Sequence, residues 1–304
     1  MRATFFKTIE EVYLQRDDIF VLTADLGYKL FDSLKEQCAD RFYDIGIAES
    51  NMIGVASGLA LSGKTVYCYS MVPFLVMRAY EQVRVDVAYH NLNVRLVAVG
   101  GGLTYGLEGF THFGLEDFAL MRAMPNMTIV IPADPIEAQC LARLSRTHEG
   151  PMYIRLGRSG EPAVHDKAPR FRIGEPIFLQ EGKHIALCAV GTMVHTGAQV
   201  AGMLQQKGIK ASLINMHTLK PLNREIIRQI AAAHEVIFSM EEHFIEGGLG
   251  SAIAEVLAES GYSGTFRRVG IGELGRHTGS CDYLKDKYGL TAARVFERVI
   301  TEIK

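Results

Sequence analysis

Short apolar runs alternate with amphipathic stretches along almost the whole chain, and this alternation restricts the fold more than any other feature. Residues 19–24, 65–69 and 94–99 have the length and the β-branched content of buried strands. Residues 135–147 and 224–233 have the apolar spacing of helices with one buried face. A regular strand–helix alternation is typical of parallel sheets covered by helices. The sequence therefore predicts an α/β fold.

The alternation is interrupted once, near the middle of the chain. Residues 159–180 mix glycine, proline and charged residues without a helical period. A chain of 304 residues is also long for a single hydrophobic core. We therefore expect a first domain over residues 1–160, a linker over 161–182 and a second domain over 183–304, each domain with a mostly parallel sheet.

The bulk composition favours a protein that binds neither nucleic acid nor membranes. The net charge of -2 gives no support for nucleic-acid binding. No apolar run reaches the length of a membrane span, and the first seven residues lack the apolar core of a secretory signal. The five cysteines are scattered without a Cys-x-x-Cys pair, which indicates reduced thiols and a cytoplasmic location.

One acidic residue, Glu49, stands in unusual surroundings. It follows an apolar run that contains Gly46, and it precedes a stretch rich in small residues over 50–60. Apolar neighbours solvate a carboxylate poorly, and a poorly solvated carboxyl can exchange a proton with a bound ring nitrogen. The alternative is an ordinary helix N-terminus, where glutamate favours the helix dipole and Ser50 or Asn51 caps the first turn.

The run around Glu49 resembles a segment of the transketolase family, in the pyrimidine-binding domain of thiamine-diphosphate enzymes. Further motifs follow in the order of the family, and together they cover almost the whole chain. They are residues 69–75 (YSMVPFL), 78–84 (RAYEQVR), 109–117 (GFTHFGLED), 125–127 (PNM), 132–134 (PAD), 218–222 (TLKPL), 241–243 (EEH) and 247–250 (GGLG). The resemblance implies a pyrimidine-binding domain followed by a transketolase C-terminal domain.

The resemblance implies that Glu49 and His112 are catalytic and that Glu49 shares a proton with the aminopyrimidine ring of thiamine diphosphate. That ring needs an aromatic or apolar wall to stack on. Phe74 and Leu75 both remain candidates, because the aromatic residue of the family corresponds to Leu75 and Phe74 stands one place before it. Tyr69 is a third candidate for cofactor binding. The alternative for these side chains is ordinary core packing.

The resemblance also implies a substrate site. Arg158 lies at a strand end, where open α/β sheets place ligands, and a guanidinium suits a phosphate or a carboxylate. Arg2 and Glu108 match substrate-binding positions of the family, although by its position alone each could be a solvated charge. Gly100 or Gly101 stands where transketolases carry a basic side chain. This difference predicts a modified, branched or differently placed anionic sugar as the substrate.

Residues 241–243 (Glu-Glu-His) and the glycines that follow them match a signature of the family's C-terminal domain. The resemblance implies a role in assembly there and no catalytic role. Metal ligation by Glu241 and His243 is a weaker alternative, because no second histidine has helical ligand spacing. We therefore predict no metal site within this chain.

Half of the expected cofactor site is missing from the sequence. The family holds Mg²⁺ and the diphosphate with a Gly-Asp-Gly motif and a later asparagine, and no Gly-Asp-Gly occurs here. The chain also starts where the pyrimidine-binding domain of the family starts. We therefore expect a separate N-terminal subunit that carries the diphosphate-binding domain, and a heterotetramer in which two copies of this chain form a homodimer.

The resemblance thus implies the C-terminal subunit of a split transketolase, which transfers a two-carbon ketol unit from a ketose or its phosphate to an aldose or its phosphate. Three alternatives remain: the beta chain of a 2-oxoacid dehydrogenase, a relative of 1-deoxyxylulose-phosphate synthase, and a non-catalytic dimerisation partner. The motifs at 78–84 and 218–222 fit transketolase better than the first alternative. The presence of Glu49 and His112 argues against the third.

Overall fold

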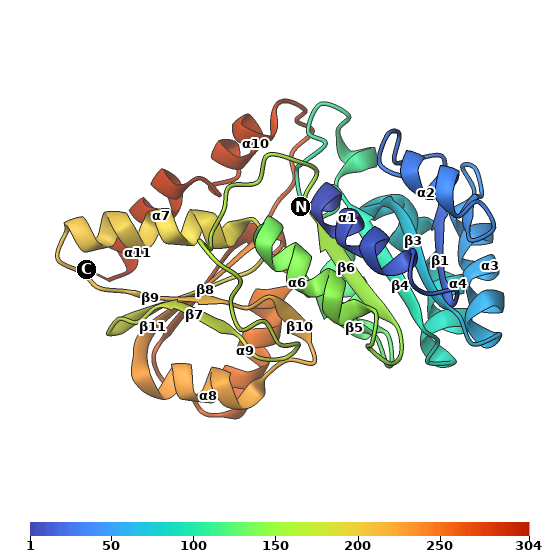
Figure 1. Cartoon of the computed structure of the whole chain (residues 1–304). Helices are drawn as coiled ribbons and strands as arrows, with labels where there is room; N and C mark the ends of the chain where they lie inside the picture. Colours follow the sequence, from blue (N-terminus) through green and yellow to red (C-terminus); the bar gives the residue numbers. More distant parts are fainter. Residues whose placement is uncertain (304) are drawn as a thin grey trace.

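The chain is built around two β-sheets, and the computed structural model describes residues 1–303 (Figure 1). The first sheet has seven strands in the order β10-β5-β6-β4-β3-β1-β2. They are β1 (Ile19–Thr23), β2 (Phe42–Asp44), β3 (Thr65–Met71), β4 (Val94–Val99), β5 (Thr128–Val130), β6 (Met152–Leu156) and β10 (Thr218–Lys220). All neighbouring strands are parallel except β10, which pairs antiparallel with β5. The predicted strands at 19–24, 65–69 and 94–99 are confirmed as β1, β3 and β4.

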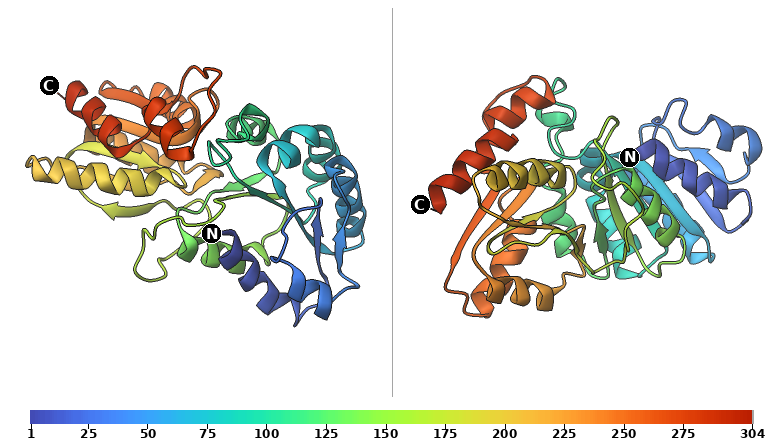
Figure 2. Two further views of the ribbon diagram at one scale, coloured as in Figure 1. Left: turned by 90° about the horizontal axis from the view of Figure 1, so that it is seen from above. Right: turned by 60° about the vertical axis from the view of Figure 1, so that its left-hand side comes forward.

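Helices cover both faces of this sheet (Figures 1 and 2). One face packs against α1 (Arg2–Tyr13) and α6 (Pro135–Ser145). The other face packs against α3 (Glu49–Leu61), η1 (Pro73–Arg78), α4 (Tyr80–Gln82), η2 (Val83–Tyr89) and α5 (Asp117–Ala123). The short helices α2 (Asp32–Gln37) and η3 (Phe110–His112) lie in connecting segments. Because both faces are covered, all six residues of β4 are buried, as in parallel sheets generally.

Residues 73–89 are helical but do not form a regular α-helix. They consist of two π-helical segments, η1 and η2, on either side of the single α-helical turn α4. A π-helical turn is wider than an α-helical turn and changes the direction in which the side chains point. Such segments occur frequently at functional sites.

The second sheet has five strands in the order β12-β11-β8-β9-β7. They are β7 (Ile177–Gln180), β8 (His184–Ala189), β9 (Ser212–Asn215), β11 (His234–Phe244) and β12 (Thr265–Ile271). Only β7 runs antiparallel to its neighbour. The helices α7 (Met193–Gln206), α10 (Cys281–Lys287) and α11 (Ala292–Glu302) lie on one side, and α8 (Arg224–Ala233) and α9 (Leu249–Glu259) lie on the other (Figure 1).

The two sheets share structure and core. Strand β10 comes after β9 in the sequence, yet it completes the edge of the first sheet. One apolar cluster also joins Met121 and Met127 of the first part to Ile214, Ile227 and Leu249 of the second. The sequence did not predict this crossing, because a three-residue edge strand carries little pattern of its own. Each of the two parts therefore buries apolar side chains of the other.

Residues 161–182, the expected linker, form hydrogen bonds with the start of α6 on the first sheet. Near its end this segment contains the strand β7. Asp134, the N-cap of α6, accepts hydrogen bonds from the backbone N–H groups of Val164 (2.8 Å) and His165 (2.9 Å). The His165 ring lies 2.6 Å from the Glu137 carboxylate, and β7 belongs to the second sheet. In the part of the chain that the structure describes, no helix has both the length and the apolar character that a membrane span requires.

Candidate active site

Four loops at one edge of the first sheet carry the candidate residues. Glu49 follows β2, η1 follows β3, the loop over residues 100–112 follows β4, and Arg158 follows β6. The parallel strands β6, β4, β3, β1 and β2 are consecutive in the sheet, so their carboxyl ends lie along the same edge. Open α/β sheets bind their ligands at this edge.

Glu49 is the first residue of α3, and only 1% of it is exposed. Its Oε1 accepts a hydrogen bond from the Ser70 hydroxyl (3.2 Å), and its Oε2 accepts one from the Arg78 guanidinium (2.6 Å). Neither Ser50 nor Asn51 caps the helix, and Ser50 instead donates to the backbone carbonyl of Arg78. Because 45% of the Arg78 side chain is exposed, the partner of Oε2 can turn into solvent.

Phe74, and not Leu75, lies beside this carboxylate. The Arg78 guanidinium that binds Glu49 also lies over the Phe74 ring, 4.6 Å from its centroid. On the same ring the His112 imidazole packs edge-on, with 5.3 Å between the centroids. Phe74 is half-buried, whereas Leu75 is fully enclosed in the apolar core. The geometry therefore favours Phe74 over Leu75 as a wall for a ligand.

Tyr69 does not offer a wall, although the sequence made it a candidate. Its ring is 1% exposed and is enclosed by the rings of Phe6 and Phe31 at centroid distances of 5.2 and 5.4 Å. An aromatic ring that is packed on its faces and edges has no open surface for stacking. Its hydroxyl accepts a hydrogen bond from Arg2 (3.2 Å), so Tyr69 positions that arginine.

The loop over residues 100–112 brings Tyr105 into the site. Gly100 has a φ of +77°, and a Cβ atom there would overlap the Tyr105 ring, so both the backbone and the space require glycine. The Tyr105 ring lies 6.2 Å from the His112 ring and 5.2 Å from the Arg158 guanidinium. Glu108 is exposed and forms no ion pair with any residue in 1–303.

The side chains at this edge form one continuous line, in which each touches the next. We call it the contact row, and it consists of Glu49, Arg78, Phe74, His112, Tyr105 and Arg158. The sequence singled out four of these residues and missed Arg78 and Tyr105. Arg78 stands four residues after Phe74, a spacing that brings helical side chains together and could have indicated it. No sequence signal indicated Tyr105.

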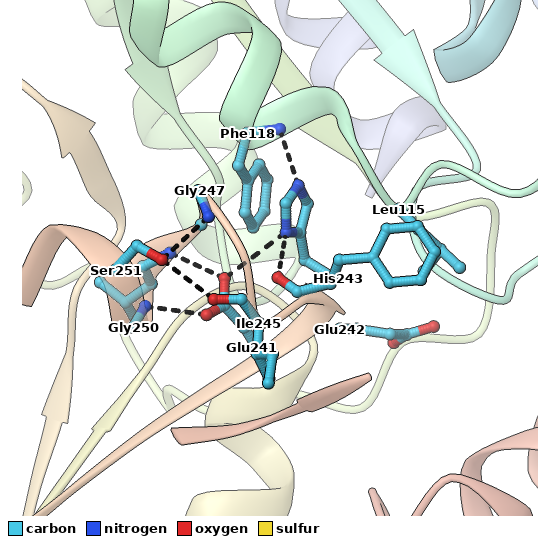
Figure 3. A network of polar contacts seen from close by, with 12 residues as sticks. Leu115, Phe118, Glu241, Glu242, His243, Ile245, Gly247, Gly250 and Ser251 are labelled. Atoms are coloured by element: carbon cyan, nitrogen blue, oxygen red, sulfur yellow. Dashed lines mark hydrogen bonds and ion pairs between the residues drawn. The ribbon is translucent and has the colours of Figure 1, made fainter. Parts of the chain in front are cut away.

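Apart from the contact row, a cluster of buried polar side chains at Glu241, Glu242 and His243 lies where the two sheets meet (Figure 3). Glu241 accepts hydrogen bonds from the backbone N–H groups of Leu249 (2.7 Å) and Gly250 (2.8 Å) at the start of α9. The His243 ring stacks on Phe118 of the first part at 4.7 Å, and its Nε2 accepts the backbone N–H of Phe118. Burial raises the pKa of Glu241 to about 7, against the opposing effect of the two N–H donors.

Glu242 binds both parts of the chain at once. Its Oε1 accepts from the backbone N–H of Leu103, and its Oε2 accepts from the Thr192 hydroxyl and from Lys285 at 2.8 and 2.9 Å. Burial would raise the pKa of Glu242, but Lys285 and the Leu103 N–H outweigh burial and hold that pKa below its ordinary value. Among residues 1–303, no group of three or more His, Cys, Asp or Glu side chains could hold a metal ion. The cluster joins the two sheets.

Comparisons with known proteins agree with this architecture. Residues 1–162 match the family model of the transketolase pyrimidine-binding domain, and residues 174–295 match that of the transketolase C-terminal domain. The 6-deoxy-6-sulfo-D-fructose transketolase subunit SqwH of Clostridium sp. (strain MSTE9) is 37% identical over 97% of this chain and 92% of its own length. An apulose-4-phosphate transketolase subunit from Phocaeicola vulgatus is 35% identical over 100% of this chain and 97% of its own length.

A solved structure gives the same answer. A split-gene transketolase, in the form of an inactive beta4 tetramer, matches with a TM-score of 0.88 and 36% sequence identity, over 99% of this chain and 97% of that one. These two relatives, which match over more than nine tenths of their own length, are transketolase subunits, which favours transketolase over a 2-oxoacid dehydrogenase chain or a dimerisation partner. The chain therefore belongs to the transketolase family, with the pyrimidine-binding and C-terminal domains of that family in its two-domain α/β fold.

Proposed function

We propose that this chain is the C-terminal subunit of a split transketolase that depends on thiamine diphosphate. With a separate N-terminal subunit it transfers a two-carbon ketol unit from a ketose or ketose phosphate to an aldose or aldose phosphate. The observation that carries the proposal is the contact row. It aligns a buried carboxylate, an aromatic ring, an imidazole and a guanidinium along the ligand-binding edge of the sheet.

The first residues of the contact row fit the aminopyrimidine half of the cofactor. When it is bound, thiamine diphosphate supplies the nucleophilic carbon that cleaves the bond beside a ketose carbonyl and carries the two-carbon unit. Glu49 then holds a proton at Oε2, the oxygen that faces the exchangeable partner Arg78, while Ser70 keeps Oε1 in place. Phe74 provides the stacking face once Arg78 turns into solvent.

The far half of the contact row suits the substrate. The His112 Nδ1 lies 2.9 Å from the Thr111 hydroxyl, which orients the ring and leaves Nε2 without a hydrogen-bond partner in residues 1–303. We assign His112 to proton transfer at a sugar hydroxyl or carbonyl, a task that suits an imidazole near neutral pH. Arg158 and Arg2 bind the anionic end of the sugar, and Glu108 accepts from one of its hydroxyls.

The proposal assigns Mg²⁺ and the diphosphate to the separate N-terminal chain. Its support is the absence of a Gly-Asp-Gly motif from the sequence, together with relatives named as transketolase subunits. The assembly we propose is a heterotetramer that contains a homodimer of this chain. The scattered cysteines, none of them in a disulfide within residues 1–303, support a cytoplasmic location.

Reconstitution tests the proposal. The chain is mixed with the product of a neighbouring gene that carries Gly-Asp-Gly, and a ketose donor and ribose 5-phosphate are added with thiamine diphosphate and Mg²⁺. We expect a product that is two carbons longer than the acceptor, formed only when both chains and the cofactor are present. Each chain alone serves as the control and should be inactive.

The same assay separates the alternatives. Turnover that requires pyruvate and releases carbon dioxide would replace the proposal with a 1-deoxyxylulose-phosphate synthase relative or, with a lipoyl-domain acceptor, a 2-oxoacid dehydrogenase. A complex that forms but binds no thiamine diphosphate would leave only the non-catalytic dimerisation partner.

A further inference from the structure

The space above Gly100 is filled by a side chain from the same loop. The Tyr105 ring lies directly on the Gly100 backbone, where any Cβ atom at position 100 would overlap it. The positive φ of Gly100 independently excludes most other residues. Tyr105 itself is only 6% exposed, so its position is determined by packing rather than by solvent.

The surroundings of Tyr105 contain positive charge that the chain does not neutralise. Within residues 1–303, Arg158 forms neither an ion pair nor a side-chain hydrogen bond, although its guanidinium lies 5.2 Å from the Tyr105 ring centroid. Arg2 donates only to the neutral hydroxyl of Tyr69. Tyr105 itself donates no hydrogen bond to a carboxylate within residues 1–303, so the Arg158 charge beside it stays uncompensated there. Two guanidinium groups without carboxylate partners favour an anionic ligand.

The phenol of Tyr105 has no hydrogen-bond partner either, among the residues that the structure describes. Burial raises the pKa of Tyr105, and the effects of Arg158 and Arg2 only partly oppose this. The hydroxyl therefore keeps its proton at neutral pH and is a donor. The Tyr105 phenol and the Arg158 guanidinium therefore lie side by side, with the His112 imidazole on the other side of the Tyr105 ring.

We propose that Tyr105 is a specificity-determining residue of this transketolase chain. Its ring, packed on Gly100, holds the Tyr105 hydroxyl between His112 and Arg158, and this hydroxyl donates to the sugar or to its anionic group. The part of the sugar that this hydroxyl contacts is its anionic end, which the proposed function assigns to Arg158. This inference rests on the proposed function, because it assumes that the contact row binds the sugar.

A purely structural role for Tyr105 makes a different prediction. If the ring only fills space above Gly100, its removal should disturb the whole loop, including His112. The kcat/KM values of all donors would then fall by the same factor, whether or not the donor carries an anionic group. A role in specificity requires that donors which reach Arg158 lose more than donors which do not.

The test uses the reconstituted complex and three donors: erythrulose, which is short and neutral, xylulose 5-phosphate and 6-deoxy-6-sulfofructose. For Tyr105→Leu we expect kcat/KM on the preferred anionic donor to fall about 10-fold more than on erythrulose, mainly through KM. Tyr105→Phe keeps the ring and should fall by about 3- to 10-fold, the value of one hydrogen bond. Comparison of the two anionic donors shows whether the site prefers phosphate or sulfonate.

The control is Tyr89→Leu, because Tyr89 is 72% exposed at the end of η2 and lies outside the contact row. It should leave all three donors unchanged. Equal losses on all donors for Tyr105→Leu, or no loss for either Tyr105 variant, would overturn the proposal. If the unmodified complex shows no turnover that depends on thiamine diphosphate, the proposed function itself fails, which is a separate result.

Discussion

Two sites with buried glutamates differ in the partners that hold their carboxylates. Glu49 begins α3, and its Oε2 is paired with a side chain that is 45% exposed. Glu241 and Glu242 lie near the end of β11, and their oxygens are bound by backbone N–H groups and, for Glu242, also by the partly exposed side chains of Thr192 and Lys285. Among the described residues, Glu49 has only side-chain partners, whereas Glu241 and Glu242 are each held by at least one backbone N–H. We therefore propose that Glu49 can exchange Arg78 for a ligand and that the other two carboxylates are structural.

The largest effect should come from Glu49→Gln. The variant keeps the size of the side chain and removes the group that exchanges a proton, so turnover of the reconstituted complex should fall ~100-fold or more. The fold should be unaffected, because an amide can still pair with Ser70. Glu81→Gln, an exposed change on α4, is the matched control. A Glu49→Gln complex that retains most of its rate would remove the distinction between the two sites.

Glu242→Gln should lower the stability of the chain, in contrast to Glu49→Gln, which should lower turnover. It weakens the bonds to Lys285, Thr192 and Leu103 across the junction of the two sheets. We expect the free energy of unfolding to fall by about 2 kcal/mol, the range for hydrogen bonds to a buried charge. Urea unfolding of the isolated chain measures this. Unchanged stability would mean that the junction does not depend on this carboxylate.

Much of the architecture was predictable from the sequence, because parallel strands buried on both faces are nearly continuous apolar runs, as in β4. The junction was not predictable, since β10 contributes only three residues to the distant sheet. Within the site, the choice between Phe74 and Leu75 depended on the π-helical geometry of η1. Tyr105 depended on loop packing over Gly100, for which the sequence carries no periodic signal.

The stability of the chain should depend on pH through Glu241. The pKa of Glu241 is raised from 4.5 to about 7 in the folded chain, so the folded state binds the proton more tightly than the unfolded state. Stability is therefore highest below pH 4.5 as far as this group is concerned, and it falls as the pH rises toward 7. His148, His217 and His243, whose pKa values burial lowers to about 4, act in the opposite direction, so the comparison with Glu241→Gln isolates this group. Thermal unfolding between about pH 4.5 and 7.5 should show that the wild type loses stability relative to Glu241→Gln as the pH rises. A stability difference between the two that does not change with pH would contradict the assignment.

The smallest effect should come from Arg78→Ala. The pair with Glu49 is partly exposed on the side of Arg78, so its loss should reduce the stability of the isolated chain by about 1 kcal/mol or less. In a Glu49→Gln background the same change should cost still less, because the charge on the partner is already gone. A loss that is equal in both backgrounds would show that Arg78 stabilises the chain independently of Glu49.

Under the proposed function, the contact row supplies only the aminopyrimidine half of a thiamine-diphosphate site. Titration calorimetry with thiamine diphosphate and Mg²⁺ tests this most directly, on the isolated chain and on its complex with the chain that carries Gly-Asp-Gly. We expect tight binding to the complex and only binding weaker than micromolar to the chain alone. Sub-micromolar binding to the chain alone would contradict the division of the site between two chains.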